Sequence, residues 1–186
     1  MPIQVDIAER KHDIAEATFR VAAENGLEGV TIRSVAAEMG ASTTVITNYL
    51  PSRAELLVNA VDLLGDEWVI QLEKIHADGG DDVILRAMRA SVGWDDAEQI
   101  RCQFWVDLLT APGRAGQVDD HLRKTAQRVR SIVEDMLVDI GHREPGVTAD
   151  LLFLFAQGVF VSIVEDPGSW PPERVIAAAE RLVDLV

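Results

Sequence analysis

Five polar side chains stand close together in one segment of the sequence: Thr43, Thr44, Thr47, Asn48 and Tyr49. Threonine and asparagine lower helix propensity because their side chains compete for backbone hydrogen bonds, yet apolar residues keep helical spacing around them here. Threonine can contact a thymine methyl group or a phosphate, asparagine can make paired hydrogen bonds to adenine, and tyrosine can donate to a phosphate. The chemistry on offer is therefore recognition of a polar surface by hydrogen bonding.

Two short helices would position these side chains. Thr31 is placed to cap a helix over 32–38, and Gly40 breaks that helix. Ser42 is placed to cap a second helix over 43–49, in which apolar Val45 and Ile46 would face inward. Two helices joined in this way form a helix-turn-helix, whose second helix enters the DNA major groove. The predicted DNA-binding residues are Thr31, Arg33, Ser42, Thr43, Thr44, Thr47, Asn48, Tyr49 and Arg53.

The net charge restricts how this segment could hold DNA. The 186 residues include 31 acidic and 17 basic side chains, for a formal net charge of -14. That balance argues against a bulk electrostatic grip on DNA or on an anionic membrane. Residues 1–56 alone carry five basic and eight acidic side chains. We therefore expect few phosphate contacts, with Arg33 and Arg53 best placed to make them.

Helical patterning extends along the whole chain. Apolar residues recur every three or four positions, and no run alternates as a strand would. Ser52 and Glu55 have the spacing of a capping box, which would open a long helix. We predict an all-α protein of about nine helices, with an N-terminal three-helix unit followed by a larger α-helical domain. The expected helices run over 8–24, 32–38, 43–49, 52–75, 82–92, 96–110, 118–140, 148–164 and 172–186.

The segment from about Arg10 to Leu57 resembles the N-terminal part of the TetR-type bacterial transcriptional regulators. The resemblance is carried by Ile14 with Ala17-Thr18, Gly26, Val30-Thr-Ile-Arg-Ser-Val-Ala36, Gly40-Ala-Ser42 and Tyr49-Leu-Pro-Ser-Arg-Ala-Glu-Leu56. Three positions depart from the family pattern: Thr47 stands where a tyrosine is usual, and Leu50 and Ala22 stand where phenylalanine is usual. The two smaller apolar residues imply a leaner core beneath the DNA-binding segment.

This resemblance implies two domains, a helix-turn-helix DNA-binding domain over 1–52 and a ligand-binding and dimerisation domain over 53–186. It also implies that the long helix from Ser52 links them, and that the last two long helices pair with their copies in a homodimer. The helix over 148–164 is apolar nearly all round, which agrees with an interface, although a central core helix is an equal alternative. The predicted interface residues are Phe155, Gly158, Val161, Ser162, Val175, Ala179 and Leu182.

Aromatic residues of the second domain could line an apolar ligand cavity, or they could form an ordinary core. The candidate ligand-binding residues are Trp68, Met88, Trp94, Cys102, Gln103, Phe104, Trp105, Phe153, Gln157 and Phe160. A basic cluster also stands out, formed by Arg123, Lys124, Arg128 and Arg130. We interpret the cluster as a solvated helix face, whereas two inward-facing members would indicate an acidic ligand.

Other chemistry finds little support in the sequence. Its four histidines lack zinc-binding spacing, and no phosphate-binding glycine motif or nucleophile elbow occurs, so we expect no metal and no cofactor. One cysteine, Cys102, excludes an internal disulfide framework. The start of the chain lacks a signal-peptide pattern, and the apolar run over 151–164 is too short to span a membrane, so we expect a cytoplasmic protein with no membrane partner.

Together these patterns predict a homodimeric, ligand-responsive DNA-binding regulator that is not an enzyme. We expect a repressor that a small, largely apolar molecule releases from a pseudo-palindromic operator on double-stranded DNA. Two alternatives remain at this stage. An all-α chain with an aromatic pocket could instead be an enzyme that transforms a small molecule. The acidic N-terminal unit could also use its helix-turn-helix for protein contacts.

Overall fold

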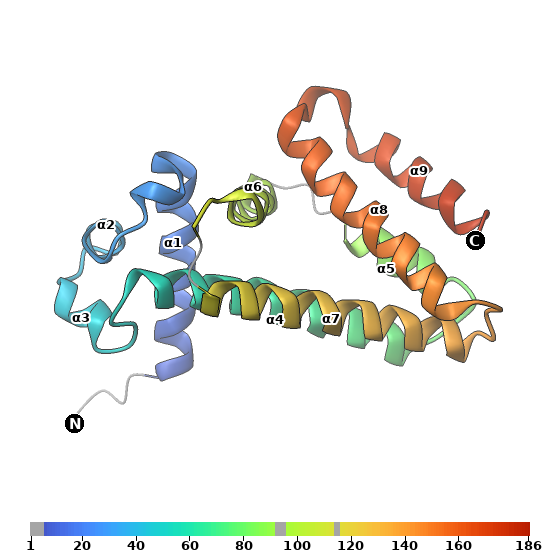
Figure 1. Ribbon diagram of the computed structural model, residues 1–186, viewed down its shortest axis with the longest axis horizontal. Coiled ribbons are helices and arrows are strands. Elements are labelled where there is room, and N and C mark those ends of the chain that lie inside the picture. The colour runs from blue at the N-terminus through green and yellow to red at the C-terminus, as the bar shows by residue number, and fades with distance from the viewer. Residues whose placement is uncertain (1–5, 92–95, 114–115) are drawn as a thin grey trace. The chain divides into compact units, whose positions relative to one another are not determined.

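The computed structural model describes residues 6–91, 96–113 and 116–186 of the chain. These residues form nine α-helices and one short 3-10 helix, with no strand among them (Figure 1). The all-α prediction is therefore confirmed. The elements are α1 (Ile7–Gly29), α2 (Ile32–Glu38), α3 (Thr43–Thr47), α4 (Arg53–Asp78), α5 (Val83–Ala90), α6 (Asp96–Thr110), α7 (Gly116–Asp139), α8 (Pro145–Glu165), η1 (Pro167–Ser169) and α9 (Pro172–Val183).

The helices gather into two compact units that share three helices. Unit 1 contains the described residues up to Gly65 and those within 103–123, and unit 2 contains those within 66–102 and 124–186. Helices α4, α6 and α7 therefore each contribute residues to both units. The functional boundary expected between residues 52 and 53 stays a prediction.

In unit 1, local capping groups define short helices at the predicted places. The backbone of α1 breaks at Gly26, whose φ of +67° is accessible to glycine at little cost, so the helix predicted over 8–24 gains one separate turn. Thr31 and Ser34 cap α2 reciprocally, with backbone-to-hydroxyl distances of 2.9 and 3.0 Å. Gly40, at φ +61°, then turns the chain toward α3. Helices α2 and α3 pack side by side (Figure 1).

The core of unit 1 lies beneath the α2–α3 pair. Ile14 of α1, Val35 of α2 and Ile46 of α3 are completely buried. Phe19 of α1 meets Phe104 of α6 edge to face, with ring centroids 5.0 Å apart. Such pairs add specific geometry to apolar burial. The surface of α3 therefore rests on a packed support.

Unit 2 is a helical bundle built around a continuous apolar cluster. Its buried members include Leu72 of α4, Met88 of α5, Met136 of α7, Leu152 of α8 and Ala179 of α9. A smaller cluster brings α8 and α9 together beside η1. The predicted start of the last helix is confirmed, because Pro172 opens α9.

Helix α8 differs from its prediction at its start. The helix was expected over 148–164, but it begins at Pro145, where the missing N–H of proline costs no hydrogen bond. The resulting helix has 21 residues and contains an 18-residue stretch with a mean hydropathy of 2.0. By length and composition alone it could therefore cross a membrane, which corrects the expectation that this run is too short. A packed helix of a folded domain meets the same criterion, and α8 places five residues in the interior of unit 2.

Candidate functional site

The polar residues of α3 project from the surface of unit 1. Thr43, Thr44, Thr47 and Asn48 are exposed, whereas Ile46 is completely buried. This division follows from helical spacing, since one face of a short amphipathic helix packs while the other meets solvent. The inward-facing position predicted for Ile46 is confirmed.

The exposed side chains of α3 are largely uncommitted. In the part of the chain that the structure describes, Thr43, Thr44, Asn48 and Tyr49 make no side-chain hydrogen bond. Thr47 makes one long bond, from Oγ1 to the carbonyl oxygen of Thr44 at 3.4 Å. Side-chain donors and acceptors that have no hydrogen-bond partner within the chain remain available to a polar ligand.

Ser42, which was predicted to cap α3, does not cap it with its side chain. Ser42 holds the N-cap position, but its side chain makes no capping hydrogen bond. By contrast, the capping box before α4 is present: the Ser52 N–H lies 3.1 Å from Glu55 Oε2, and the Glu55 N–H lies 3.2 Å from Ser52 Oγ. The hydroxyl of Ser42 thus remains exposed beside the α3 residues.

Most of the arginines in the N-terminal segment are already committed. Arg20 pairs with Glu38, with Nε and Oε1 2.5 Å apart. Arg53 donates from Nε to the Val30 carbonyl at 2.9 Å and from Nη2 to the Leu27 carbonyl at 2.7 Å. Arg33, at the start of α2, is exposed and forms no ion pair with another described residue. Of the two arginines expected to meet phosphates, only Arg33 therefore presents an uncommitted guanidinium.

The candidate ligand residues do not form one cluster. Met88 and Phe153 line a pocket in unit 2 of only about 30 Å³, which is close to the space one water needs. The other lining residues come from α4, α5, α7 and α8, together with Ser91 at the end of α5. It is too small for a drug-sized molecule in the conformation described.

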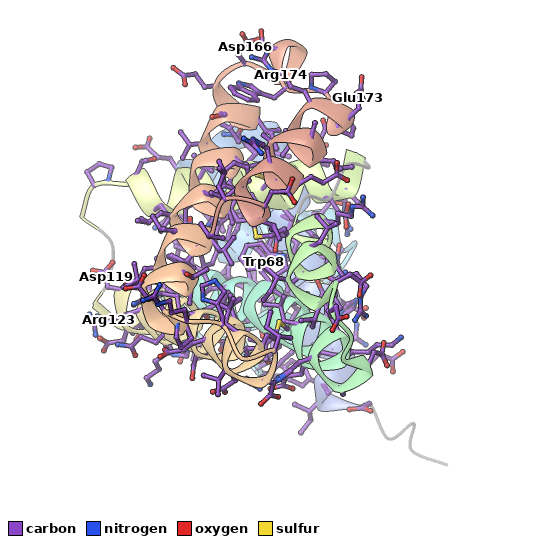
Figure 2. All side chains as sticks on the ribbon, turned by 90° about the vertical axis from the view of Figure 1, so that its right-hand side faces the viewer. Trp68, Asp119, Arg123, Asp166, Glu173 and Arg174 are labelled. Carbon is purple, nitrogen blue, oxygen red and sulfur yellow. The ribbon has the colours of Figure 1, made fainter. Side chains whose placement is uncertain are left out.

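A second group of candidates surrounds the aromatic stack of Trp68 and Phe160. Trp68, labelled in Figure 2, lies with its ring centroid 5.5 Å from that of Phe160 and its plane 15° from parallel. Cys102 Sγ lies 3.7 Å from the Phe160 carbonyl oxygen. Burial raises the pKa of the Cys102 thiol from 9.0 to about 12, so the thiol is neutral at physiological pH. Gln157 is half-buried on the same helix as Phe160.

The remaining candidate ligand-binding residues belong to neither of these two groups. Phe104 and Trp105 are buried in unit 1, where Phe104 packs on Phe19. Gln103 Nε2 donates to Asp107 Oδ1 at 2.6 Å in the same unit. Trp94 lies outside the described residues. The structure thus divides the predicted pocket into separate groups.

The candidate interface residues also divide, by exposure. Gly158 and Val161 are exposed on α8, and Phe155, Ser162 and Leu182 are half-buried. Val175 and Ala179 are buried within unit 2. Val175 packs with residues of α8, and Ala179 lies in the larger apolar cluster of unit 2. Neither buried side chain could contact a second copy without rearrangement.

Sequence reasoning missed three exposed apolar residues of α8. Val147, Leu151 and Leu154 have exposed fractions of 61%, 45% and 65%. Together with Gly158 and Val161 they recur at alternating spacings of four and three, the period of a helix-packing stripe. We call these five residues the α8 stripe. A hollow of about 230 Å³ between α8 and α9 lies against it, lined by Phe155, Gly158, Val159, Ser162, Trp170, Val175 and Ala178.

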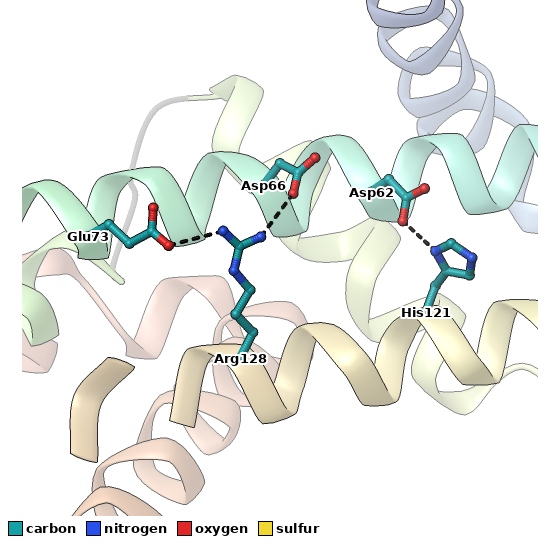
Figure 3. Close-up of polar contacts among 5 residues, drawn as sticks. All are labelled: Asp62, Asp66, Glu73, His121 and Arg128. Atoms are coloured by element: carbon teal, nitrogen blue, oxygen red, sulfur yellow. Dashed lines mark hydrogen bonds and ion pairs between the residues drawn. The ribbon is translucent and has the colours of Figure 1, made fainter. Parts of the chain in front are cut away.

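The basic cluster on α7 engages in ion pairs. Within unit 2, Arg128 lies 3.0 Å from Glu73 and 3.6 Å from Asp66, both on α4 (Figure 3). Within unit 1, His121 Nδ1 lies 2.5 Å from Asp62 Oδ1, again between α7 and α4. Arg130 pairs with Asp150 of α8. These exposed pairs agree with a solvated helix face and not with a site for an acidic ligand.

The comparisons with known proteins bear on both units. A family model described as bacterial regulatory proteins, tetR family, matches residues 14–60, which include all of α2 and α3. The solved structure of a transcriptional regulator from Rhodococcus is 25% identical and superposes with a TM-score of 0.85 over 95% of each chain. Residues 14–60 thus match the tetR family model, and the chain shares the fold of this transcriptional regulator.

Two curated relatives match the chain over shorter lengths. The transcriptional regulator PksA of Bacillus subtilis is 37% identical over 75 residues, or 40% of this chain and 37% of that regulator. The transcriptional repressor DrrR1 of Streptomyces coeruleorubidus is 43% identical over 44 residues, or 24% of this chain and 16% of the repressor. The matches therefore span well under half of either relative. The family and these relatives are regulators and not enzymes.

The departures from the TetR-family pattern have a structural setting. Ala22 and Leu50 are each only 5% exposed, so the smaller side chains occupy core positions of unit 1. Thr47 lies on the exposed face, where the usual tyrosine would reach further from the helix. Compared with the family pattern, the core at Ala22 and Leu50 is therefore smaller, and the side chain of Thr47 extends less far from α3.

Proposed function

We propose that the chain is a homodimeric transcriptional regulator, most simply a repressor, that binds a pseudo-palindromic operator through α3 of each copy. The observation that carries this proposal is the exposed set of Thr43, Thr44 and Asn48, whose side chains make no hydrogen bond within the described chain. Asparagine and threonine match the hydrogen-bonding groups and methyl groups of the major groove. A repressing role is supported by one relative, DrrR1, which is a transcriptional repressor.

Operator binding would depend on few charges. The N-terminal segment is acidic overall, and its ion pairs commit Arg20 and Arg10 to neighbouring carboxylates. Arg33 is the best-placed cation for a phosphate. Base contacts and dimerisation must then supply a larger share of the affinity than in a strongly basic DNA-binding protein.

The proposed dimer uses the α8 stripe. An exposed apolar stripe on a folded domain indicates a surface that is covered by a partner. In a twofold dimer the stripe would meet its own copy, and Gly158 would let the two backbones approach closely. Phe155, Ser162 and Leu182 would lie at the margin of such an interface, whereas Val175 and Ala179 would support it from inside each copy.

The effector is proposed to be a small and largely apolar molecule bound in unit 2. Met88, Phe153, Trp68 and Phe160 are the residues best placed to receive it, after an opening of the small pocket. Release from DNA requires that the effector bind better to a conformation with a tilted α4, which carries residues of both units. A coupling of roughly 1–3 kcal/mol would change operator affinity about 5- to 150-fold.

We also propose that the chain acts in the cytoplasm, where its operator lies, and that it catalyses no reaction on its effector. The enzyme alternative is disfavoured because several of the charged groups of unit 2, including Arg128 and Arg130, are engaged in ion pairs at its surface. The protein-contact alternative for α3 is disfavoured by the composition of its exposed face, since exposed threonine and asparagine suit a hydrated polar partner. Turnover of a bound compound would revive the first alternative.

The direct test is selection of bound duplexes from a random DNA library with the purified chain, at low and at physiological salt. The proposal predicts a recovered sequence with two inverted half-sites whose centres lie about one helical turn apart. No enrichment at either salt concentration would refute it and would favour the protein-contact alternative.

A further inference from the structure

Arg53 joins two distant parts of the DNA-binding unit. It is the first residue of α4, yet its guanidinium donates to carbonyls 23 and 26 positions earlier, those of Val30 and Leu27. Both distances, 2.9 and 2.7 Å, are those of well-formed hydrogen bonds. Leu27 lies in the last turn of α1, after the break at Gly26, and Val30 follows that turn; we call residues 27–30 the link to α2.

This link needs an external donor. The break at Gly26 ends the regular hydrogen-bond ladder of α1, and helix ends leave carbonyl groups without internal partners. The Leu27 carbonyl receives the Val30 N–H at 3.1 Å, and Arg53 supplies its second bond. A planar guanidinium presents parallel N–H groups that can serve two carbonyls at once, whereas a lysine ammonium acts as a single point.

The tether leads directly to the recognition helix. Val30 precedes Thr31, the cap of α2, and the Ala41 N–H then bonds to the Ala36 carbonyl at 2.8 Å, in the turn before α3. On its other side, Arg53 follows Ser52, which the capping box with Glu55 fixes. The guanidinium therefore ties the base of the α2–α3 pair to the start of α4.

We propose that Arg53 is a positioning residue for operator recognition: it holds α2 and α3 at the angle that DNA binding requires, and it does not act as a phosphate contact. This inference rests on the proposed function. It also assigns Arg53 a role different from the one its charge and its position after α3 suggest. Arg33, which lacks such a tether, keeps the role of phosphate contact.

Salt dependence separates the two roles. Each phosphate contact contributes about -0.9 to the slope of log affinity against log salt, so losing one contact per protomer makes the slope of a dimer shallower by about 1.8. Loss of a positioning residue weakens binding without releasing fewer counterions. The slope therefore stays at the wild-type value when only the geometry of α3 is disturbed.

The test compares Arg53→Lys and Arg53→Ala with the matched pair Arg33→Lys and Arg33→Ala. Operator affinity of the full chain is measured by fluorescence anisotropy at several potassium chloride concentrations, using the duplex selected by the wild type. Circular dichroism at the assay temperature establishes that each variant is folded. Both Arg53 variants should bind roughly tenfold more weakly with the wild-type slope. Arg33→Ala should make the slope shallower, and Arg33→Lys should restore it.

Three other results have distinct meanings. Wild-type affinity for Arg53→Lys, or a shallower slope for Arg53→Ala, would overturn the inference and make Arg53 a phosphate contact. If Arg53→Ala is unfolded at the assay temperature, Arg53→Lys decides alone, because lysine keeps the charge but cannot serve both carbonyls. Failure of the wild type to bind any duplex would refute the proposed function itself, and the inference would fall with it.

Discussion

Helices α3 and α8 both present exposed residues that a folded monomer leaves uncovered, but their chemistry is opposite. The exposed face of α3 consists of hydroxyl and carboxamide groups around Asn48, whereas the α8 stripe consists of aliphatic side chains around Leu154, which is 65% exposed. Polar groups lose little by exposure, because water satisfies them until a ligand does. Removing exposed aliphatic groups from water, by contrast, lowers the free energy of the system.

The chemistry of each surface determines the kind of partner that it requires. A hydrated, hydrogen-bonding partner such as the DNA groove fits α3, and its contacts would be specific and exchangeable. A dry and self-complementary partner fits α8, and its contacts would be lasting. Permanent pairing through α8 would place two α3 helices in one dimer. Both recognition surfaces could then bind the same operator at once.

The largest expected effect comes from a charge in the α8 stripe. Leu154→Glu should raise the dimer dissociation constant roughly 100-fold or more, because an unpaired buried charge costs about 3–5 kcal/mol. Sedimentation equilibrium measures this constant. The matched control is Ile70→Glu on α4, since Ile70 is 63% exposed but lies outside the stripe. Equal dimerisation by both variants would contradict the assignment of α8.

A smaller effect is expected from α3. Asn48→Ala should weaken operator binding roughly 5- to 150-fold, because a paired hydrogen bond to a base contributes about 1–3 kcal/mol of discrimination. Anisotropy titration measures the change, and the dimer should persist. The control is Asn25→Ala in the same unit, where the side chain makes one bond to the Val21 carbonyl. Unchanged affinity for Asn48→Ala would place DNA recognition elsewhere.

The smallest effect concerns support for α3 without contact to DNA. Ser52→Ala removes the hydroxyl of the capping box, so the free energy of unfolding should fall by about 1 kcal/mol. Urea denaturation followed by circular dichroism measures this loss. Operator affinity should change less than twofold at a temperature where the variant is folded. A loss of affinity as large as that of Asn48→Ala would show that α3 depends on its setting more than on its side chains.

The sequence predicts the local features of this molecule well, since local chemistry determines them. The bounds of α2 follow from the Thr31 cap and the Gly40 turn, and α4 begins beside Ser52 because Glu55 can reach back to it. The position of Pro172 at the first turn of α9 follows in the same way. Each of these signals acts over only a few residues.

The features that sequence reasoning missed depend on distant contacts or on register. Nothing in the sequence indicates that Arg53 bonds to Leu27 and Val30, because the pairing exists only once the three helices have packed. Helix α8 is apolar on nearly every face, so no periodicity distinguishes buried Leu152 from exposed Leu154. Aromatic spacing likewise cannot tell which unit a side chain joins, as Phe104 illustrates.

The measurement that most directly tests the link between the two surfaces is binding to operators with altered half-site spacing. The wild-type dimer is titrated against the selected operator and against a version with five base pairs inserted between its half-sites, which turns one half-site to the opposite face of the duplex. If α8 pairing holds both α3 helices, affinity should fall to that of a single half-site. Equal affinity for the two duplexes would contradict this, because it would mean that each α3 binds DNA independently of the dimer.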